Sequence, residues 1–200
     1  MKKVLKIFFM FLAAVVAIYV VLVIIRMFHF YNLDKTNEQV AKIHNTKLTM
    51  DDVTGKNLPQ DPGAEADKTI AGIDANKNGI RDDVELAIFK QYPNSAKTRA
   101  VLLQYALVLQ MQMTLPILNK ETVTATVEDG DRALHCIWSI TPRVDMKKFL
   151  EETEKNENFV KQRQINNEQR DKYQLDFYKY LKSYSSPNKG CDLDISMLPN

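Results

Sequence analysis

An uninterrupted apolar run near the amino terminus constrains this chain more than any other feature. Residues 7–25 contain no charged residue, no glycine and no proline. As a helix with a rise of about 1.5 Å per residue, they would extend about 28 Å, close to the hydrocarbon thickness of a bilayer. A helix that is apolar on every side needs lipid or a large protein around it. We therefore expect a transmembrane helix at 7–25, with the lipid bilayer as its partner.

A cleaved secretory signal peptide is the main alternative for this run. The apolar region of such a peptide usually runs about 7–15 residues and ends at a small-x-small cleavage site. Here the run is longer, and it continues after Ala17 with bulky residues from Ile18 to Ile25. We therefore predict an uncleaved signal anchor.

The charges beside the run predict its orientation. Lys2, Lys3 and Lys6 lie before it, whereas Arg26 is the only full positive charge close behind it. Cytoplasmic flanks carry the excess of Lys and Arg. Residues 1–6 are therefore expected in the cytoplasm and the body outside it, which in a bacterium means the periplasm.

The rest of the chain has nearly balanced charge. Three of the 27 basic residues precede the run, and none of the 25 acidic residues precedes Asp34. The body from Arg26 onward is therefore slightly acidic, whereas a nucleic-acid-binding domain would show a basic surplus. We expect no nucleic-acid partner.

Residues 74–85 match the twelve-residue pattern of a calcium-binding loop. Calcium prefers oxygen ligands, and the pattern supplies them at alternate positions, with a glycine for the sharp bend and a glutamate at the end. The predicted ligands are Asp74, Asn76, Asn78, Ile80 through its carbonyl oxygen, Asp82 directly or through water, and Glu85. Two of these are amides, so we expect a weak site with a dissociation constant of about 10⁻⁵–10⁻³ M. The alternative is an Asn-rich turn before a helix whose amino terminus is capped by acidic residues.

The body is predicted to be all-α, because no run of alternating β-branched residues is bounded by a tight turn. Residues 26–60 are expected to form a tether, with a short helix around Glu38–Ile43 at most, and residues 61–200 a small helical calcium-binding domain. The expected helices are Ala64–Ile73, Asp82–Gln91, Ala96–Met113 at the centre, Lys120–Ser139 and Glu168–Tyr184. Pro62 and Asn94 or Ser95 mark two of their starts, and Asn166 or Asn167 can cap the last one.

The two cysteines, Cys136 and Cys191, both lie in the predicted extracytoplasmic part. An even number of cysteines in an oxidising compartment predicts a disulfide, which would attach the tail to the body. Two unpaired buried thiols are the alternative. Four aromatic residues recur at helical spacing in the last predicted helix, where they form either part of the core or a partner-binding stripe: Tyr173, Phe177, Tyr180 and Tyr184.

The loop resembles a bacterial EF-hand. The wider pattern is similar to a group of small uncharacterised exported or membrane-anchored proteins of Gram-negative bacteria. The stretches that carry this similarity are residues 61–63, 72–85, 167–173 and 190–194. The resemblance implies an exported helical domain with a bound cation, and it implies no activity.

These observations favour a non-enzymatic binding or envelope-accessory module whose fold calcium stabilises. A calcium sensor that exposes an apolar surface is the alternative, but sensor loops usually work in pairs and only one loop is present. A hydrolase is less favoured, because the sequence contains neither Gly-x-Ser-x-Gly nor His-Glu-x-x-His. His135 and Cys136 are adjacent, and adjacent residues on a helix point about 100° apart.

Overall fold

A computed structural model describes residues 2–186 and 190–200 of the chain. All regular secondary structure in these residues is helical, so the predicted all-α fold is confirmed. The chain divides into two compact units, Met1–Gln39 and Val40–Asn200, which are described separately.

The first unit consists of most of helix α1 (Lys2–Asn45). Between Val4 and Leu33 its large apolar side chains are exposed. The helix is long and apolar enough to cross a membrane, and its most apolar stretch is not buried by any part of the protein. The predicted span at 7–25 lies within it. Since apolar side chains on every face need apolar surroundings, lipid is the environment that this helix suits.

The predicted tether, residues 26–60, is divided between the two units. It begins as helix, because α1 continues to Asn45, and after a short break it forms α2 (Met50–Thr54). The side chain of Thr49 caps α2, and Gly55 ends it with a left-handed backbone. Isolated apolar positions after residue 39 pack in the core of the second unit: Val40, Ile43, Leu48 and Val53. These residues therefore belong to the body.

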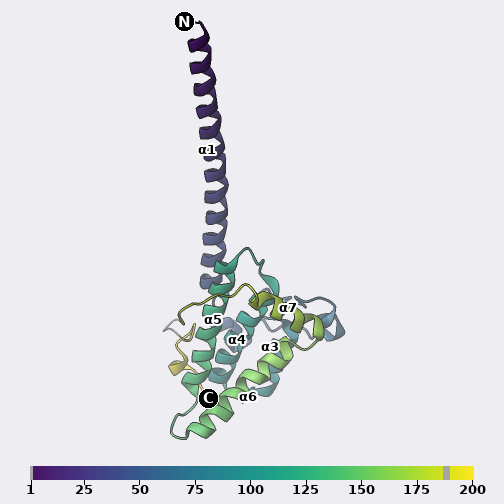
Figure 1. Ribbon diagram of the computed structural model, residues 1–200. Helices are drawn as coiled ribbons and strands as arrows, with labels where there is room; N and C mark the ends of the chain where they lie inside the picture. The colour runs from purple at the N-terminus through teal and green to yellow at the C-terminus, as the bar shows by residue number, and fades with distance from the viewer. Residues whose placement is uncertain (1, 187–189) are drawn as a thin grey trace. The chain divides into compact units, whose positions relative to one another are not determined.

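Helix α4 (Ala96–Thr114) is the centre of the second unit, as predicted (Figure 1). It contacts α2, α3, α5, α6, α7 and η2. The side chain of Ser95 caps it by accepting the backbone N–H of Thr98. Nearly every side chain from Arg99 to Met113 is buried. An apolar helix of this length is therefore covered by protein, whereas the apolar part of α1 is not.

The other helices surround α4. They are α3 (Asp82–Gln91), α5 (Lys120–Ile140), α6 (Met146–Gln164) and α7 (Glu168–Tyr178), with the short 3-10 helices η1 (Gly63–Asp67) and η2 (Ile195–Met197). Asn167 caps α7 by accepting the backbone N–H of Arg170, which confirms one of the two predicted caps. Most of the core is one cluster that extends from Ile43 to Leu198, and a smaller cluster joins Phe177 of α7 to α5.

The predicted helix Ala64–Ile73 is wrong. Only η1 forms, and residues 68–73 are irregular. Gly72 has a φ of +67°, a left-handed conformation that interrupts a helix. The carbonyl oxygens of Ala66, Thr69 and Ile70 accept hydrogen bonds from Arg170. That of Thr69 also accepts the N–H of Gly72, three residues later, which closes a turn and not an α-helix.

The last predicted helix, Glu168–Tyr184, is too long. Helix α7 ends at Tyr178. Beyond it, the N–H groups of Lys179, Tyr180 and Leu181 donate to carbonyl oxygens three residues earlier, which is the tighter pattern that often closes a helix. The aromatic spacing therefore continues past the point where the helix stops.

Candidate functional site

The backbone of the predicted calcium loop bends around the carboxylate of Asp74. One oxygen of this side chain accepts the N–H of Asn78 at 3.2 Å, and the other accepts the N–H of Gly79 at 2.9 Å. Gly79 has a φ of +84°, which other residues adopt only with strain. A Cβ at this position would also lie 2.7 Å from Leu107 Cδ1. The sharp bend that the sequence predicts at this glycine is therefore present.

Positions 3, 5 and 12 of the loop come together. The side-chain amide of Asn76 donates to one oxygen of Glu85 at 3.0 Å, and the amide of Asn78 donates to the other oxygen at 3.0 Å. Glu85 lies in the first turn of α3 and is only 1% exposed. The amide of Asn76 also donates to the carbonyl oxygen of Asn57 at 3.0 Å, which links the loop to the segment after α2. Three of the six predicted ligands therefore face one another.

Asp82 closes the loop at its base. Its carboxylate accepts the N–H of Ala75 at 3.0 and 3.2 Å, and its own N–H donates to the carbonyl oxygen of Ile73 at 2.9 Å. The side chain of Ile80 is fully buried, and its N–H donates to Asn78 Oδ1 at 2.9 Å. Ligation by Asp82 and by the carbonyl oxygen of Ile80 stays a prediction.

Burial controls the charge of the loop. It raises the pKa of the Glu85 carboxyl to about 7, although the amides of Asn76 and Asn78 act in the opposite direction. Burial also raises the pKa of Asp82, and the nearby carboxylate of Asp74 adds to this effect. A carboxylate removed from water favours its neutral form unless a positive charge compensates it. A cation beside Glu85 would supply that compensation.

The donor set suits a hard cation that accepts mixed oxygen ligands. The predicted set contains three carboxylates, two amides and one main-chain carbonyl, a composition that calcium prefers. Within the described residues, no three His, Cys, Asp or Glu side chains gather closely enough to hold a metal ion, so the three predicted carboxylates do not converge on one point. A cation beside Glu85 would therefore need the amide oxygens of Asn76 and Asn78 as ligands. Each amide oxygen accepts one backbone N–H and has a second lone pair available.

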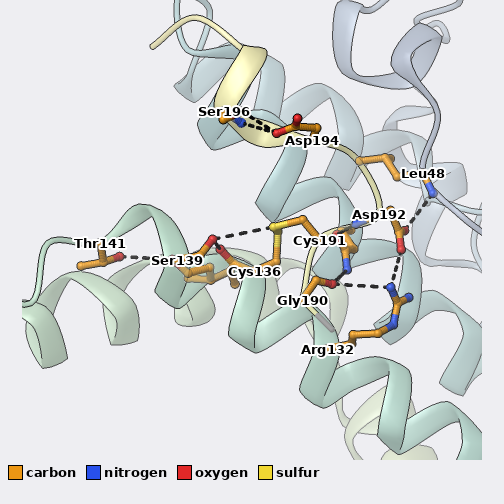
Figure 2. The surroundings of a disulfide bond; sticks show 12 residues. Leu48, Arg132, Cys136, Ser139, Thr141, Gly190, Cys191, Asp192, Asp194 and Ser196 are labelled. Carbon is orange, nitrogen blue, oxygen red and sulfur yellow. Dashed lines mark hydrogen bonds and ion pairs between the residues drawn. A yellow bond between two sulfur atoms is a disulfide. The ribbon is translucent and has the colours of Figure 1, made fainter. Parts of the chain in front are cut away.

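The predicted disulfide between Cys136 and Cys191 is present. Figure 2 shows that the tail beside it is bound to α5 and to the start of the body. Asp192 accepts hydrogen bonds from Arg132 at 2.7 Å and from the N–H of Leu48 at 3.0 Å. Gln104 of α4 donates to the carbonyl oxygen of Gly190 and accepts the N–H of Asp192. The disulfide is thus one part of a larger attachment of the tail.

The four aromatic residues of the predicted partner stripe do not form one exposed face. Phe177 is buried and packs with Val123 and Val127, and Tyr173 is half-buried. Tyr184 is half-buried and donates its hydroxyl to Asp131 at 3.0 Å. Tyr180 is exposed. Phe177 therefore belongs to the core and Tyr184 packs against it, and a protein partner at these residues stays a prediction.

Two buried arginines beside the loop are functional candidates that the sequence analysis missed. Arg81 and Arg170 are both fully buried. Their backbone acceptors lie roughly eighty to one hundred residues away along the chain, so no local pattern marks them. An arginine between a predicted ligand and an acidic helix start suggests a surface residue, because fully buried arginine is rare.

No family model, curated protein or solved structure matches this chain. The resemblance to bacterial EF-hands therefore rests on the residues of the loop.

Proposed function

We propose that this protein is a membrane-anchored, extracytoplasmic binding module whose helical domain is stabilised by calcium bound at residues 74–85. The observation that carries the proposal is the convergence of Asn76, Asn78 and the buried Glu85 around a bend that is held by Asp74. A divalent cation would take the place of the two amide N–H donors beside Glu85, with the amide oxygens turned toward it as ligands, and it would compensate the buried negative charge.

Three features support the location. Helix α1 is long and apolar enough to cross a membrane. The three lysines before the apolar run favour a cytoplasmic amino terminus. The disulfide between Cys136 and Cys191 is typical of proteins outside the reducing cytoplasm. Together they favour a body on the extracytoplasmic side, which is the periplasm if the source is a bacterium.

A structural role for calcium is favoured over a sensor role. Sensor EF-hands respond to calcium by changing the angle between the two helices that flank the loop. Here a helix, α3, follows the loop, whereas residues 68–73 before it are irregular. A single helix has no partner against which to open, so the proposed effect of calcium is to stiffen the loop.

Calorimetric titration of calcium into the full chain in detergent micelles tests the proposal. We expect one site with a dissociation constant of about 10⁻⁵–10⁻³ M. The variant Glu85→Gln removes a charged ligand with little change in size, so it should weaken binding at least tenfold. Glu121→Gln is the matched control, because its side chain is half exposed and pairs with Lys120. It should bind as the wild type does.

The same samples allow a second readout. At a calcium concentration of about one hundred times the dissociation constant, binding should add about 2.7 kcal/mol to the free energy of unfolding. Absence of heat and of any thermal shift in the wild type would overturn the proposal. An equal shift in wild type and Glu85→Gln would move the calcium site elsewhere in the chain.

A further inference from the structure

The first buried arginine joins the end of the loop to the end of α6. Arg81 immediately precedes α3 and is fully buried. Its guanidinium donates to the carbonyl oxygens of Arg163 and Gln164 and pairs with Asp83. The last carbonyls of a helix lack partners within it. Arg81 supplies two of these missing donors to α6.

The second buried arginine joins the start of the loop to the start of α7. Arg170 donates to the carbonyl oxygens of Ala66, Thr69 and Ile70, and it pairs with Asp67. These acceptors belong to residues 66–73, which we call the approach segment because it leads into the loop. Arg170 therefore replaces the helical hydrogen bonds that this segment does not make.

Both arginines act on the same turn of the chain. Residues 163–170, which we call the α6–α7 corner, contain the carbonyls that bind Arg81 and contain Arg170 itself. Gln110 of α4 completes the connection, since it donates to the carbonyl oxygen of Ala71 at 2.6 Å and accepts from Gln164. The approach segment, the loop exit and the corner thus share one buried polar network.

This network leaves little room for independent movement. A Cβ on Gly72 would collide with the side chain of Arg81, so the approach segment lies directly against that arginine. A buried guanidinium that loses its acceptors stays charged without compensation, which is costly. Displacement of the loop would therefore expose Arg81 or separate it from its acceptors. Displacement of the corner would separate Arg170 from its acceptors.

We propose that a divalent cation bound in the loop fixes the α6–α7 corner through Arg81 and Arg170. The inference rests on the proposed calcium site and adds its regulatory consequence. The cation joins the Glu85 carboxylate to the amide oxygens of Asn76 and Asn78, which fixes the first turn of α3. Arg81 begins that helix, so its guanidinium stays on the carbonyls of α6. The approach segment is held at the same time, and Arg170 stays on it.

Hydrogen exchange measured by mass spectrometry on the full chain in detergent micelles tests the coupling. Calcium is compared with chelator. If the corner opens only when the loop does, calcium at about one hundred times its dissociation constant should slow exchange about one hundredfold in both regions. Peptides of α5 between residues 123 and 133 should change much less.

Two variants separate coupling from binding. Arg170→Lys keeps the charge and all six predicted ligands, but it cannot reach several carbonyls at once. It should bind calcium and keep protection in residues 74–85, whereas the effect of calcium on residues 163–170 falls to about tenfold or less. Arg81→Lys should give the same pattern. Arg143→Lys is the matched control, since Arg143 is exposed and stacks on Phe149 at the far end of α6.

The outcomes are distinguishable. No binding of calcium in the titration overturns both this inference and the proposed function. Binding with protection confined to the loop overturns the inference alone, as does an equal slowing of α5 and the corner. If Arg170→Lys does not fold, Arg81→Lys and the wild-type comparison of the corner with α5 still decide the matter.

Discussion

Two irregular segments of the body are fastened to its helices in different ways. The approach segment, residues 66–73, is held by the side chain of Arg170, which donates to three of its backbone carbonyls. The tail around Gly190–Asp192 is also bound by an arginine and a glutamine, but a disulfide joins it covalently to α5. Both segments lack regular hydrogen bonds, and both border the central helix α4.

The comparison shows how an irregular segment is held with a disulfide and without one. In the tail, the disulfide keeps the segment close to the body, so the segment stays attached when a single hydrogen bond breaks. The approach segment contains no cysteine and so no disulfide. Its position depends on buried charges and, in our proposal, on a cation. The position of the approach segment should therefore be more sensitive to the loss of one buried donor.

The largest expected effect is loss of the buried arginine at the approach segment. Arg170→Met removes the donor to the carbonyl oxygens of Ala66 and Ile70, and it removes the charged partner of Asp67. The free energy of unfolding should therefore fall by about 3–5 kcal/mol. Chemical unfolding of the full chain in micelles, followed by far-ultraviolet circular dichroism, measures it. Arg143→Met, at an exposed position, should cost less than about 0.5 kcal/mol. Equal unfolding curves for the two variants would show that the segment does not depend on Arg170.

Removal of the crosslink should have a somewhat smaller effect. The disulfide closes a stretch of 55 residues, and its loss through Cys136→Ser with Cys191→Ser should cost about 3 kcal/mol. In the oxidised protein, Asp192→Asn should cost only about 1 kcal/mol, because the tail stays attached. If Asp192→Asn cost as much as the loss of the disulfide, the polar contacts and not the crosslink would hold the tail.

An effect smaller than loss of the disulfide concerns the charge of Glu85. In the folded protein burial raises its pKa to about 7 from an ordinary 4.5. Between these values the folded state keeps a proton that the unfolded state releases, so stability falls as pH rises through this window. With chelator present we expect a loss of about 2 kcal/mol between pH 4.5 and pH 7.

Thermal unfolding at several pH values checks this sign. Glu85→Gln cannot ionise, so its stability should fall less over the same window, whereas the Glu121→Gln control should behave as the wild type does. Calcium favours the charged carboxylate and should restore the wild type near pH 7. A rise in wild-type stability relative to Glu85→Gln across this window would contradict the direction of the pKa shift.

The sequence predicts well those helices that are capped by nearby residues or that are apolar on most faces. Ser95 and Asn167 cap their helices through hydrogen bonds only three residues long, which a sequence displays directly. Helix α4 is recognised because it is apolar on most faces. Its glutamines separate it from a membrane span, and in the fold they find partners such as the carbonyl oxygens of Gly190 and Ala71.

Distant partners explain what the sequence did not predict. Residues 64–73 have the composition of a short helix. In the fold, however, carbonyl oxygens of this segment accept hydrogen bonds from Arg170, about one hundred residues later in the sequence. The loop was predicted because its pattern is contiguous, and its bend and the meeting of Asn76 and Asn78 with Glu85 follow from twelve neighbouring residues. The hydrogen bonds between Arg81 and the end of α6 join residues about eighty positions apart, and no local pattern predicts them.

The disulfide has a consequence for proteolytic processing. Helices α6 and α7, with the corner between them, all lie within the stretch that Cys136 and Cys191 close. A protease that cuts once anywhere in this stretch produces two polypeptides that remain linked through sulfur. The tail would stay bound to Arg132 and Gln104, and the fragment would separate only after reduction. A nick in this half of the domain therefore changes the connectivity of the backbone without releasing any part of the protein.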